Sequence, residues 1–426
     1  MAVISCSIAG GFHIPAAKIK GWFYSFTHSF HHCQLSFAPN VRSLSLYNAH
    51  NRPRPVSLRA SSSFDIVPPP IDDDLHDVMV AEGAKLLEDG IVETFGNDEV
   101  AMKAVEDGVA VVDLSHFGRI RVTGEDRIQF LHNQSTADFQ VLTEGQGCET
   151  VFVTPTARTI DIANAWVMKN AITLLVSPTT CSSILGMLEK YIFFTDKVEL
   201  QDITKKTCFF TLIGPKSIQV MEDLNLGDLV GKPYGTHLHY NVNGMPITAG
   251  VGNVLSEDSF SLMLSPASAG SVWKVLLSLG AVPMGANVWE RLRVIQGRPS
   301  PGKELTNEFN VLEACLRKAV SLNKGCYKGQ ETIARLVTYD GVKQRLWGIR
   351  LDGPVEPGSA IIVEGKKVGK LTSYVVGNQN VEHVGLGYVK RHAGSEGREV
   401  LVGDVRGVLV DAPFLRQSSH VNQHIS

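Results

Sequence analysis

Apolar residues along the chain follow two different spacings, and the texture changes near residue 340. Before this point, stretches with apolar residues three to four positions apart alternate with short apolar runs, which predicts a mixture of helices and strands. Helices are predicted over residues 81–87, 97–104, 124–131, 179–191, 215–224, 289–295 and 330–337, and strands over 109–114, 118–122, 149–153, 160–167, 172–176 and 208–213. The order lacks a regular β-α-β rhythm, so residues 76–340 are predicted to form an α+β body of two intertwined subdomains.

Residues 341–415 have a different pattern, in which short apolar runs are separated by turns rich in Gly, Pro, Asp and Asn. Strands of this length and spacing are typical of a small antiparallel barrel. They are predicted over residues 346–351, 360–363, 368–373, 385–389, 400–402 and 408–410. The last residues, 416–426, have no recognisable pattern and are expected to be a tail.

The first sixty residues contain no Asp or Glu, many serines and six basic residues: Lys18, Lys20, Arg42, Arg52, Arg54 and Arg59. A basic, acid-free segment without a long apolar run is typical of an organelle transit peptide. We therefore expect a transit peptide over residues 1–60 and a linker over 61–75, with the chloroplast stroma as destination and the mitochondrial matrix as second choice. A basic tail with no targeting role is the alternative.

Loss of these six cations changes the formal net charge from −3 to −9, so the remaining protein is acidic. Such a charge disfavours nucleic-acid binding, which depends on neutralising phosphates. No run reaches the roughly 20 apolar residues that span a bilayer, so no membrane association is expected. There is no C-x-x-C pair, so no metal site is predicted. Free thiols are expected for Cys148, Cys181, Cys208, Cys315 and Cys326.

One short run stands out as candidate chemistry, Lys324-Gly325-Cys326-Tyr327-Lys328-Gly329-Gln330-Glu331, followed by Ala334-Arg335. The two glycines permit a tight turn that presents Cys326 just before a helix. A helix N-terminus and flanking lysines favour a thiolate. Gln330 and Glu331 are expected to support this turn, with Arg335 placed to pair with Glu331. The alternative is that Cys326 is a small buried residue and that Tyr327 packs in a core.

This K-G-C-Y-x-G-Q-E run resembles the signature of the YgfZ/GcvT-like family. Its members are folate-binding proteins of iron–sulfur cluster assembly and repair, related to the aminomethyltransferase, or T-protein, of the glycine cleavage system. Residues 113–131, D-L-S-H-F-G-R-I-R-V-T-G-x-D-R-x-x-F-L, independently resemble the opening of the aminomethyltransferase-like fold. The resemblance implies that folate-binding fold with a C-terminal antiparallel β-barrel, and the chain looks like a plant chloroplast member.

The resemblance also implies a site for tetrahydrofolate. Glu257, in S-E-D-S-F, is the position of the glutamate that holds the pterin, and Arg293 is that of an arginine that contacts the folate tail. Asp161 matches the first of two paired aspartates beside the reactive nitrogens, whereas the second is replaced by Ile162. Tyr327 is a further candidate for contact with the ligand. A solvated turn for Glu257, Arg291 in place of Arg293, and a turn cap for Asp161 are the alternatives.

Three functions follow from these patterns. The first is a tetrahydrofolate-dependent protein that supports iron–sulfur cluster assembly or repair, with Cys326 as reactive thiol. Its partners would be folate and either cluster assembly proteins or client cluster enzymes. The second is a transferase that moves an aminomethyl-derived one-carbon unit to tetrahydrofolate. The third is an adaptor for cluster proteins that does not use folate.

Overall fold

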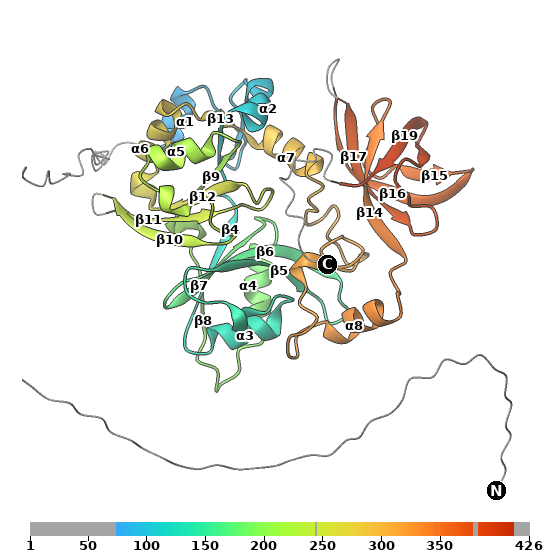
Figure 1. Cartoon of the computed structure of the whole chain (residues 1–426), viewed down its shortest axis with the longest axis horizontal. Helices are drawn as coiled ribbons and strands as arrows, with labels where there is room; N and C mark the ends of the chain where they lie inside the picture. The colour runs from blue at the N-terminus through green and yellow to red at the C-terminus, as the bar shows by residue number, and fades with distance from the viewer. Residues whose placement is uncertain (1–73, 243–244, 378–381, 413–426) are drawn as a thin grey trace, which may run out of the picture. The chain divides into compact units, whose positions relative to one another are not determined.

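The computed structural model describes residues 74–242, 245–377 and 382–412. The expected transit peptide over 1–60 and the tail over 416–426 lie outside the described residues, as does most of the linker. Two sheets with their helices form the body, and a closed barrel follows (Figure 1). The α-helices are α1 (Leu75–Ala81), α2 (Asp98–Asp107), α3 (Arg127–Gln134), α4 (Cys181–Glu189), α5 (Ser217–Asp223), α6 (Pro266–Ser278), α7 (Ala286–Ile295) and α8 (Gln330–Thr338).

The first sheet of the body has five antiparallel strands in the order β5-β6-β7-β4-β8. These are β4 (Gly118–Thr123), β5 (Gly147–Val153), β6 (Thr159–Val167), β7 (Ala171–Val176) and β8 (Glu199–Asp202). Helices α3 and α4 cover one face, because Leu131 and Ile184 are buried in one cluster with Ile120 and Leu174 of the sheet.

The second sheet has six strands in the order β10-β11-β12-β9-β3-β13, of which only the β3–β13 pair is parallel. They are β3 (Ala110–Asp113), β9 (Cys208–Ile213), β10 (His237–Val242), β11 (Met245–Val251), β12 (Ser259–Leu264) and β13 (Val282–Met284). Helices α1, α5 and α6 pack on its outer face, where Met79, Met221 and Trp273 share one buried cluster with Phe210. A two-stranded ribbon, β1 (Lys85–Leu86) with β2 (Val92–Thr94), forms a separate small sheet, and its Val92 is buried in the same cluster.

The inner faces of the two sheets share the largest core. Trp166 and Leu175 of the first sheet are buried together with Phe209 and Met263 of the second. Alternate residues of a strand point to opposite faces, so Ala165, next to Trp166, belongs instead to the cluster under α3 and α4. This alternation is what leaves large side chains from both sheets facing each other between the layers.

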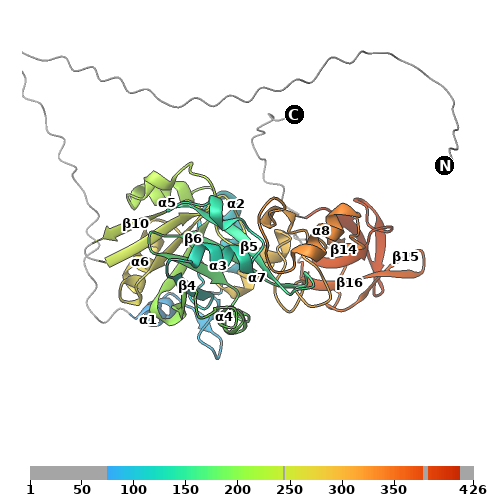
Figure 2. The same ribbon diagram turned by 90° about the horizontal axis from the view of Figure 1, so that it is seen from below.

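The barrel is closed in the order β14-β17-β16-β15-β18-β19, and all its strand pairs are antiparallel. In both views its orange and red strands form a separate group (Figures 1 and 2). Gly369 allows the close strand approach, since a Cβ there would lie 2.1 Å from the Tyr388 carbonyl oxygen. The strands are β14 (Gln344–Leu351), β15 (Ala360–Val363), β16 (Lys366–Val375), β17 (His383–Lys390), β18 (Glu399–Val402) and β19 (Val405–Val410).

The predicted α+β fold with an antiparallel barrel is confirmed. The helix predicted over residues 81–87 is wrong, because α1 ends at Ala81 and Lys85–Leu86 form β1. The Asp74 carboxylate caps the start of α1 by accepting from the His76 N–H at 2.8 Å, and Gly83 turns the chain with φ +92° after its end. Strands β10 to β13 and helix α6 were not predicted.

A buried ion pair joins α7 to the barrel. All five N–H groups of Arg293 donate within the protein, to Glu290, Glu304, Ser373 and the Arg298 carbonyl. Glu304 is fully buried and also accepts from the Ser300 N–H and from the Thr372 and Ser373 hydroxyls. One guanidinium and one carboxylate therefore hold a body helix, the segment after it and strand β16 together.

We expect Arg293→Met to lower the free energy of unfolding by about 3–5 kcal/mol, because it leaves the buried Glu304 carboxylate without its cation. Arg398→Met is the matched control, since the Arg398–Glu364 pair is solvent-exposed and should be worth less than about 1 kcal/mol. Urea unfolding followed by circular dichroism measures both. Equal losses of unfolding free energy in the two variants would show that the buried Arg293–Glu304 pair stabilises the protein no more than an exposed pair does.

Candidate functional site

Two neighbouring pockets share one wall, made of Leu255, Arg298 and Pro299. The narrow pocket, about 60 Å³, also contains Asp161 and Arg293. The wide pocket, about 260 Å³, also contains Glu257. Three residues singled out in the sequence therefore line neighbouring pockets, with Asp161 and Arg293 in one pocket and Glu257 in the other. Other lining residues are Phe117, Ile162 and Trp289 of the narrow pocket, and Glu149, Cys315, Lys318 and Arg345 of the wide one.

Asp161 is a buried side chain of β6 with every acceptor position in use. Its carboxylate accepts from the Ile162 and Ser177 N–H groups at 2.8 Å each, and from the Ser177 and Thr180 hydroxyls. Burial raises the pKa of Asp161, and these hydrogen bonds oppose that rise. A carboxylate has about four lone-pair sites, so the protein itself occupies them all.

Arg293 is equally saturated. It lies on the wall of the narrow pocket, yet its five N–H groups are all donated to protein acceptors, and the residue is 5% exposed. An arginine has no further donor to offer a ligand. All donors of Arg293 are therefore used to hold the protein together. Its predicted contact with a folate tail stays a prediction.

Arg298 is the cation with spare donors. Its Nη2 donates to the Glu149 carboxylate, and among the described residues no other hydrogen bond from its guanidinium is present. It contributes to both pockets. Arg298 was not assigned a role from sequence. Arg298 lies on an irregular segment after α7, where no helical or strand pattern of apolar residues draws attention to it.

Glu257 is exposed on the turn between β11 and β12. The Asn253 side chain shapes this turn by accepting from the Leu255 and Ser256 N–H groups. Within the described part of the chain, Glu257 itself makes no hydrogen bond or ion pair. Its carboxylate is therefore presented to the wide pocket without a protein partner.

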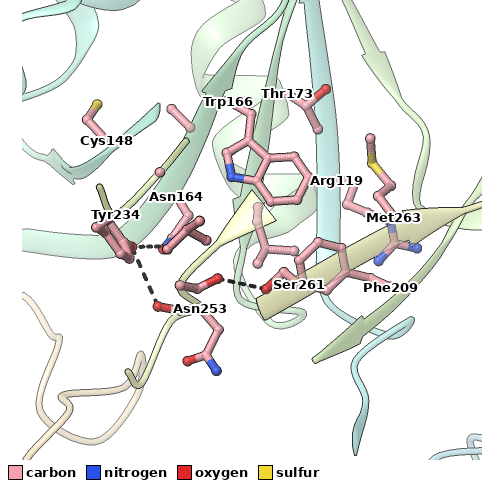
Figure 3. Close-up of a pocket in the computed structure, with 15 residues that line it drawn as sticks. Arg119, Cys148, Asn164, Trp166, Thr173, Phe209, Tyr234, Asn253, Ser261 and Met263 are labelled. Carbon is pink, nitrogen blue, oxygen red and sulfur yellow. Dashed lines mark hydrogen bonds between the residues drawn. The ribbon is translucent and has the colours of Figure 1, made fainter. Parts of the chain in front are cut away.

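A third, smaller cavity of about 20 Å³ lies between the two sheets (Figure 3). Trp166, Phe209 and Met263 form apolar walls, and Asn164 donates to the hydroxyl of Tyr234. The Asn164 Oδ1 atom is buried there without a hydrogen-bond partner in the protein. This volume suits a single water molecule, so the cavity is too small for a bicyclic ligand as it stands.

The cysteine motif lies on a turn that leads into α8, and we name residues 324–329 the motif loop. Cys326 is exposed, whereas Tyr327 is buried in the main core. Gly329 has φ +83°, and a Cβ there would lie 2.9 Å from Val153 Cγ2, so glycine is required. Gln330 accepts from the Tyr327 N–H at 3.4 Å. The narrow and wide pockets contain neither Cys326 nor Tyr327.

The lysines that flank Cys326 are directed away from it, contrary to expectation. The Lys324 ammonium is buried and donates to the carbonyl oxygens of His132, Ser135 and Ala137 at the end of α3. Lys328 Nζ lies 4.0 Å from the centre of the Tyr191 ring. Within the described residues no ion pair joins Glu331 to Arg335 either. The positive α-helix end of α8 is the one expected electrostatic feature that remains next to the thiol.

All five cysteines that the structure describes are free thiols, as predicted. Among the described residues no helix is both long and apolar enough to cross a bilayer. Likewise, no group of three or more His, Cys, Asp or Glu side chains in residues 74–242, 245–377 and 382–412 is arranged to hold a metal ion.

Comparison with known families gives two matches. Residues 75–324 match the GCVT N-terminal domain, and residues 344–417 match the glycine cleavage T-protein C-terminal barrel domain. An Arabidopsis thaliana protein named "putative transferase, chloroplastic" is 61% identical over 381 residues, covering 88% of each chain. An aminomethyltransferase of Rubrobacter xylanophilus is 28% identical over 320 residues, covering 74% of this chain and 85% of the relative.

A solved structure shares the same fold. Aminomethyltransferase T of the glycine cleavage system from Bartonella henselae superposes with a TM-score of 0.72 at 20% identity. The match covers 81% of this chain and 98% of that one. At this identity the likeness concerns the fold, including the barrel.

The buried ammonium of Lys324 predicts a pH dependence of stability. Burial lowers the pKa of Lys324 from 10.5 to about 8, because the charged form is desolvated. Between these two pH values the unfolded chain keeps a proton that the folded chain has released, so the free energy of unfolding rises with pH there. Relative to Lys324→Met, wild type should gain on the order of 3 kcal/mol from pH 8 to 10.5.

Urea unfolding at intervals from pH 7 to 10.5 measures this difference. Lys103→Met is the control for removal of a lysine charge, because Lys103 is exposed. A wild-type advantage over Lys324→Met that stays constant across the window would mean that Lys324 titrates normally in the folded protein.

Proposed function

Since the chain belongs to the GCVT family of the glycine cleavage T-protein, we propose that it binds tetrahydrofolate and supports iron–sulfur cluster assembly or repair in the chloroplast stroma. Membership of the YgfZ-like branch is part of this proposal and rests on the K-G-C-Y-K-G-Q-E run. The chloroplast is favoured by the acid-free N-terminal composition and by the printed name of the Arabidopsis relative. The partners would be cluster assembly proteins or client cluster enzymes.

The wide pocket suits a reduced folate. A pterin has adjacent N–H donors that one carboxylate can accept together, and Glu257 has an unpartnered carboxylate on this pocket. The glutamate end of the ligand is anionic and needs a cation with free donors. Arg298 has such donors, whereas Arg293 does not. We therefore assign Glu257 to the pterin and Arg298 to an acceptor or anionic group of the ligand. Arg293 would act indirectly, because its guanidinium donates to the Arg298 carbonyl and so positions Arg298.

The saturated Asp161 carboxylate is the observation that carries the choice of function. Aminomethyl transfer needs an acid–base or electrostatic group beside the folate nitrogens. Here the one remaining acid accepts four hydrogen bonds from its own chain, and Ile162 replaces the second acid. This favours folate binding without aminomethyl transfer. Cys326, exposed on a separate turn, is then the reactive group of the proposal.

Aminomethyl transfer is the second candidate, and the 28% identical aminomethyltransferase over 74% of the chain favours it. The two candidates differ in turnover. Release of a one-carbon product from purified protein with tetrahydrofolate and an aminomethyl donor would favour transfer. Binding of folate without that release would favour the role in cluster maintenance.

Titration of the purified protein with tetrahydrofolate should quench tryptophan fluorescence, because Trp289 lines the narrow pocket next to the wide one. Glu257→Ala should weaken binding about tenfold or more, since a hydrogen bond to a charged group is worth about 1.5–3 kcal/mol. Its melting temperature should not fall, because this carboxylate has no partner in the described structure. Arg298→Gln should also weaken binding.

Asp258→Ala is the control for Glu257→Ala, because it removes a neighbouring carboxylate of the same turn that is not part of the wide pocket. Equal affinity of wild type and Glu257→Ala would place the pterin elsewhere. No binding by wild type at millimolar tetrahydrofolate would instead favour an adaptor that does not use folate.

In plant cells that lack the protein, we expect wild type to restore the activity of stromal iron–sulfur enzymes and Cys326→Ala to restore well under half of it. The reason is that the proposal gives the thiol a chemical role. Asn323→Ala, an exposed change just before the motif loop, is the control and should behave as wild type. Full activity with Cys326→Ala at normal protein abundance would remove the thiol from the mechanism.

A further inference from the structure

The motif loop is fastened to the end of α3 on both sides of Cys326. Before the cysteine, Lys324 Nζ donates to the His132 carbonyl. After it, the Lys328 N–H donates to the Asn133 carbonyl at 3.0 Å. The two anchors use consecutive residues of α3, so residues 325–327 must cross over this end of the helix. The backbone on both sides of Cys326 is thereby tied to this end of α3.

The His132 side chain is buried, with 2% exposure, and its imidazole is oriented toward the loop. A Cβ built on Gly325 would lie 3.5 Å from His132 Nε2, so this nitrogen faces the residue that precedes Cys326. Because consecutive Cα atoms are about 3.8 Å apart, the Cys326 Cα lies at most about 9 Å from Nε2. In the described structure no hydrogen bond uses Nε2. This ring nitrogen therefore faces the backbone of the motif loop.

The other ring nitrogen has a carboxylate beside it. His132 Nδ1 lies 3.1 Å from Asp138 Oδ1, although the N–H does not point straight along this line, so the contact is bent. Asp138 is itself fixed, because it accepts from the Gln140 N–H at the start of the short helix Phe139–Val141. A carboxylate near Nδ1 favours the tautomer with the proton on Nδ1 and the lone pair on Nε2.

The charges around the imidazole keep it neutral. Burial is the largest effect and lowers the pKa of His132, and the nearby Lys324 ammonium lowers it further, while Asp138 opposes both. On the loop side, Lys328 is occupied by the Tyr191 ring, and Glu331 and Arg335 have no ion pair with each other. The imidazole is therefore neutral and has a lone pair on Nε2, while the same burial and the same ammonium work against the protonated ring.

We propose that His132 Nε2 accepts the proton of the Cys326 thiol and that Asp138 positions the imidazole for this step. The S–H bond breaks, an Nε2–H bond forms, and the electron pair stays on sulfur, which then bonds to an electrophile. At rest Cys326 Sγ has no hydrogen bond among the described residues. The proposed step requires the exposed Cys326 side chain to rotate toward Nε2, a kind of movement that takes nanoseconds or less. The inference rests on the proposed reactivity of Cys326 but not on folate binding.

Alkylation of the full-length protein by iodoacetamide tests this pair, with iodide as the leaving group. Quantitative mass spectrometry of digests gives the rate at each cysteine from pH 5.5 to 9.5. His132→Gln should slow alkylation of Cys326 about tenfold at pH 7, because the thiol loses its proton acceptor. The exposed Cys315, which lies beside Arg345 in the wide pocket, is an internal reference whose rate should not change.

Asp138→Asn keeps the imidazole but removes its charged partner, so it should slow Cys326 by a smaller factor. If His132→Gln does not fold, nuclear magnetic resonance of His132 provides the second measurement. A proton shared with Cys326 predicts that Cys326→Ala shifts the His132 titration curve. Unchanged Cys326 alkylation in a folded His132→Gln variant, or an unchanged His132 titration in Cys326→Ala, would overturn the proposal. Loss of folate binding would test the proposed function alone and would leave this result unaffected.

Discussion

The buried pair of Arg293 and Glu304 is the contact on which the arrangement of the site depends. Two opposite charges removed from water are tolerated only when hydrogen bonds satisfy their remaining donors and acceptors. Here Arg293 donates all five N–H groups, and Glu304 accepts from Ser300, Thr372 and Ser373 as well. The backbone of residues 298–304 is fixed between these partners. Because Arg298 lies on this segment, the shared wall of the two pockets is positioned by a contact that no ligand has to make.

The same contact explains why Arg293, which lies at the position of a ligand-binding arginine, has no donor left for a ligand. A resemblance transfers the residue type, but the donors of that residue are free only if its surroundings leave them so. Arg293 is committed to the barrel, and Asp161 is committed to the turn at Ser177 and Thr180. The groups with hydrogen-bonding capacity left for a ligand are those of Arg298, which keeps spare donors, and of Glu257, whose carboxylate has no partner in the described structure. The binding capacity of the pockets thus follows from which side chains lack internal partners, and sequence alone does not contain that information.

Much of the architecture could be predicted, because in most segments the spacing of apolar residues matches the helix or strand that the packed fold contains. The barrel strands are short apolar runs between turns, and all six were predicted close to their observed bounds. Strands β11 and β12 were missed, whereas β7 and β9, which are just as buried, were predicted from their apolar runs. Pro246 and Gly250 interrupt the run in β11, and Ser259 and Ser261 interrupt it in β12. Helix α1 was misplaced since its apolar residues Val78 and Met79 precede a similar apolar pair at 86 and 87, which is exposed. Only the Asp74 cap and the turn at Gly83 distinguish the two pairs.

The site was predictable at the level of residues but not of distances. The motif loop and Glu257 are 67 residues or more apart in the chain, and nothing in their sequences indicates whether they meet. In the structure the loop is tied to the end of α3, whose residues carried no catalytic signal: His132 and Asn133 belong to an ordinary helical stretch. Sequence reasoning placed lysine charge next to the thiol because Lys324 and Lys328 are its near neighbours. The fold instead uses Lys324 to satisfy three carbonyls at and just after the end of α3, and in doing so brings a buried histidine under the loop.

Two chemically distinct surfaces result: a pocket with an unpartnered acid and an arginine that keeps spare donors beside its Glu149 pair, and a turn with an exposed thiol whose loop is tied to the helix of His132. A chain of this kind can hold its ligand at one surface and react at the other, so loss of one activity need not abolish the other.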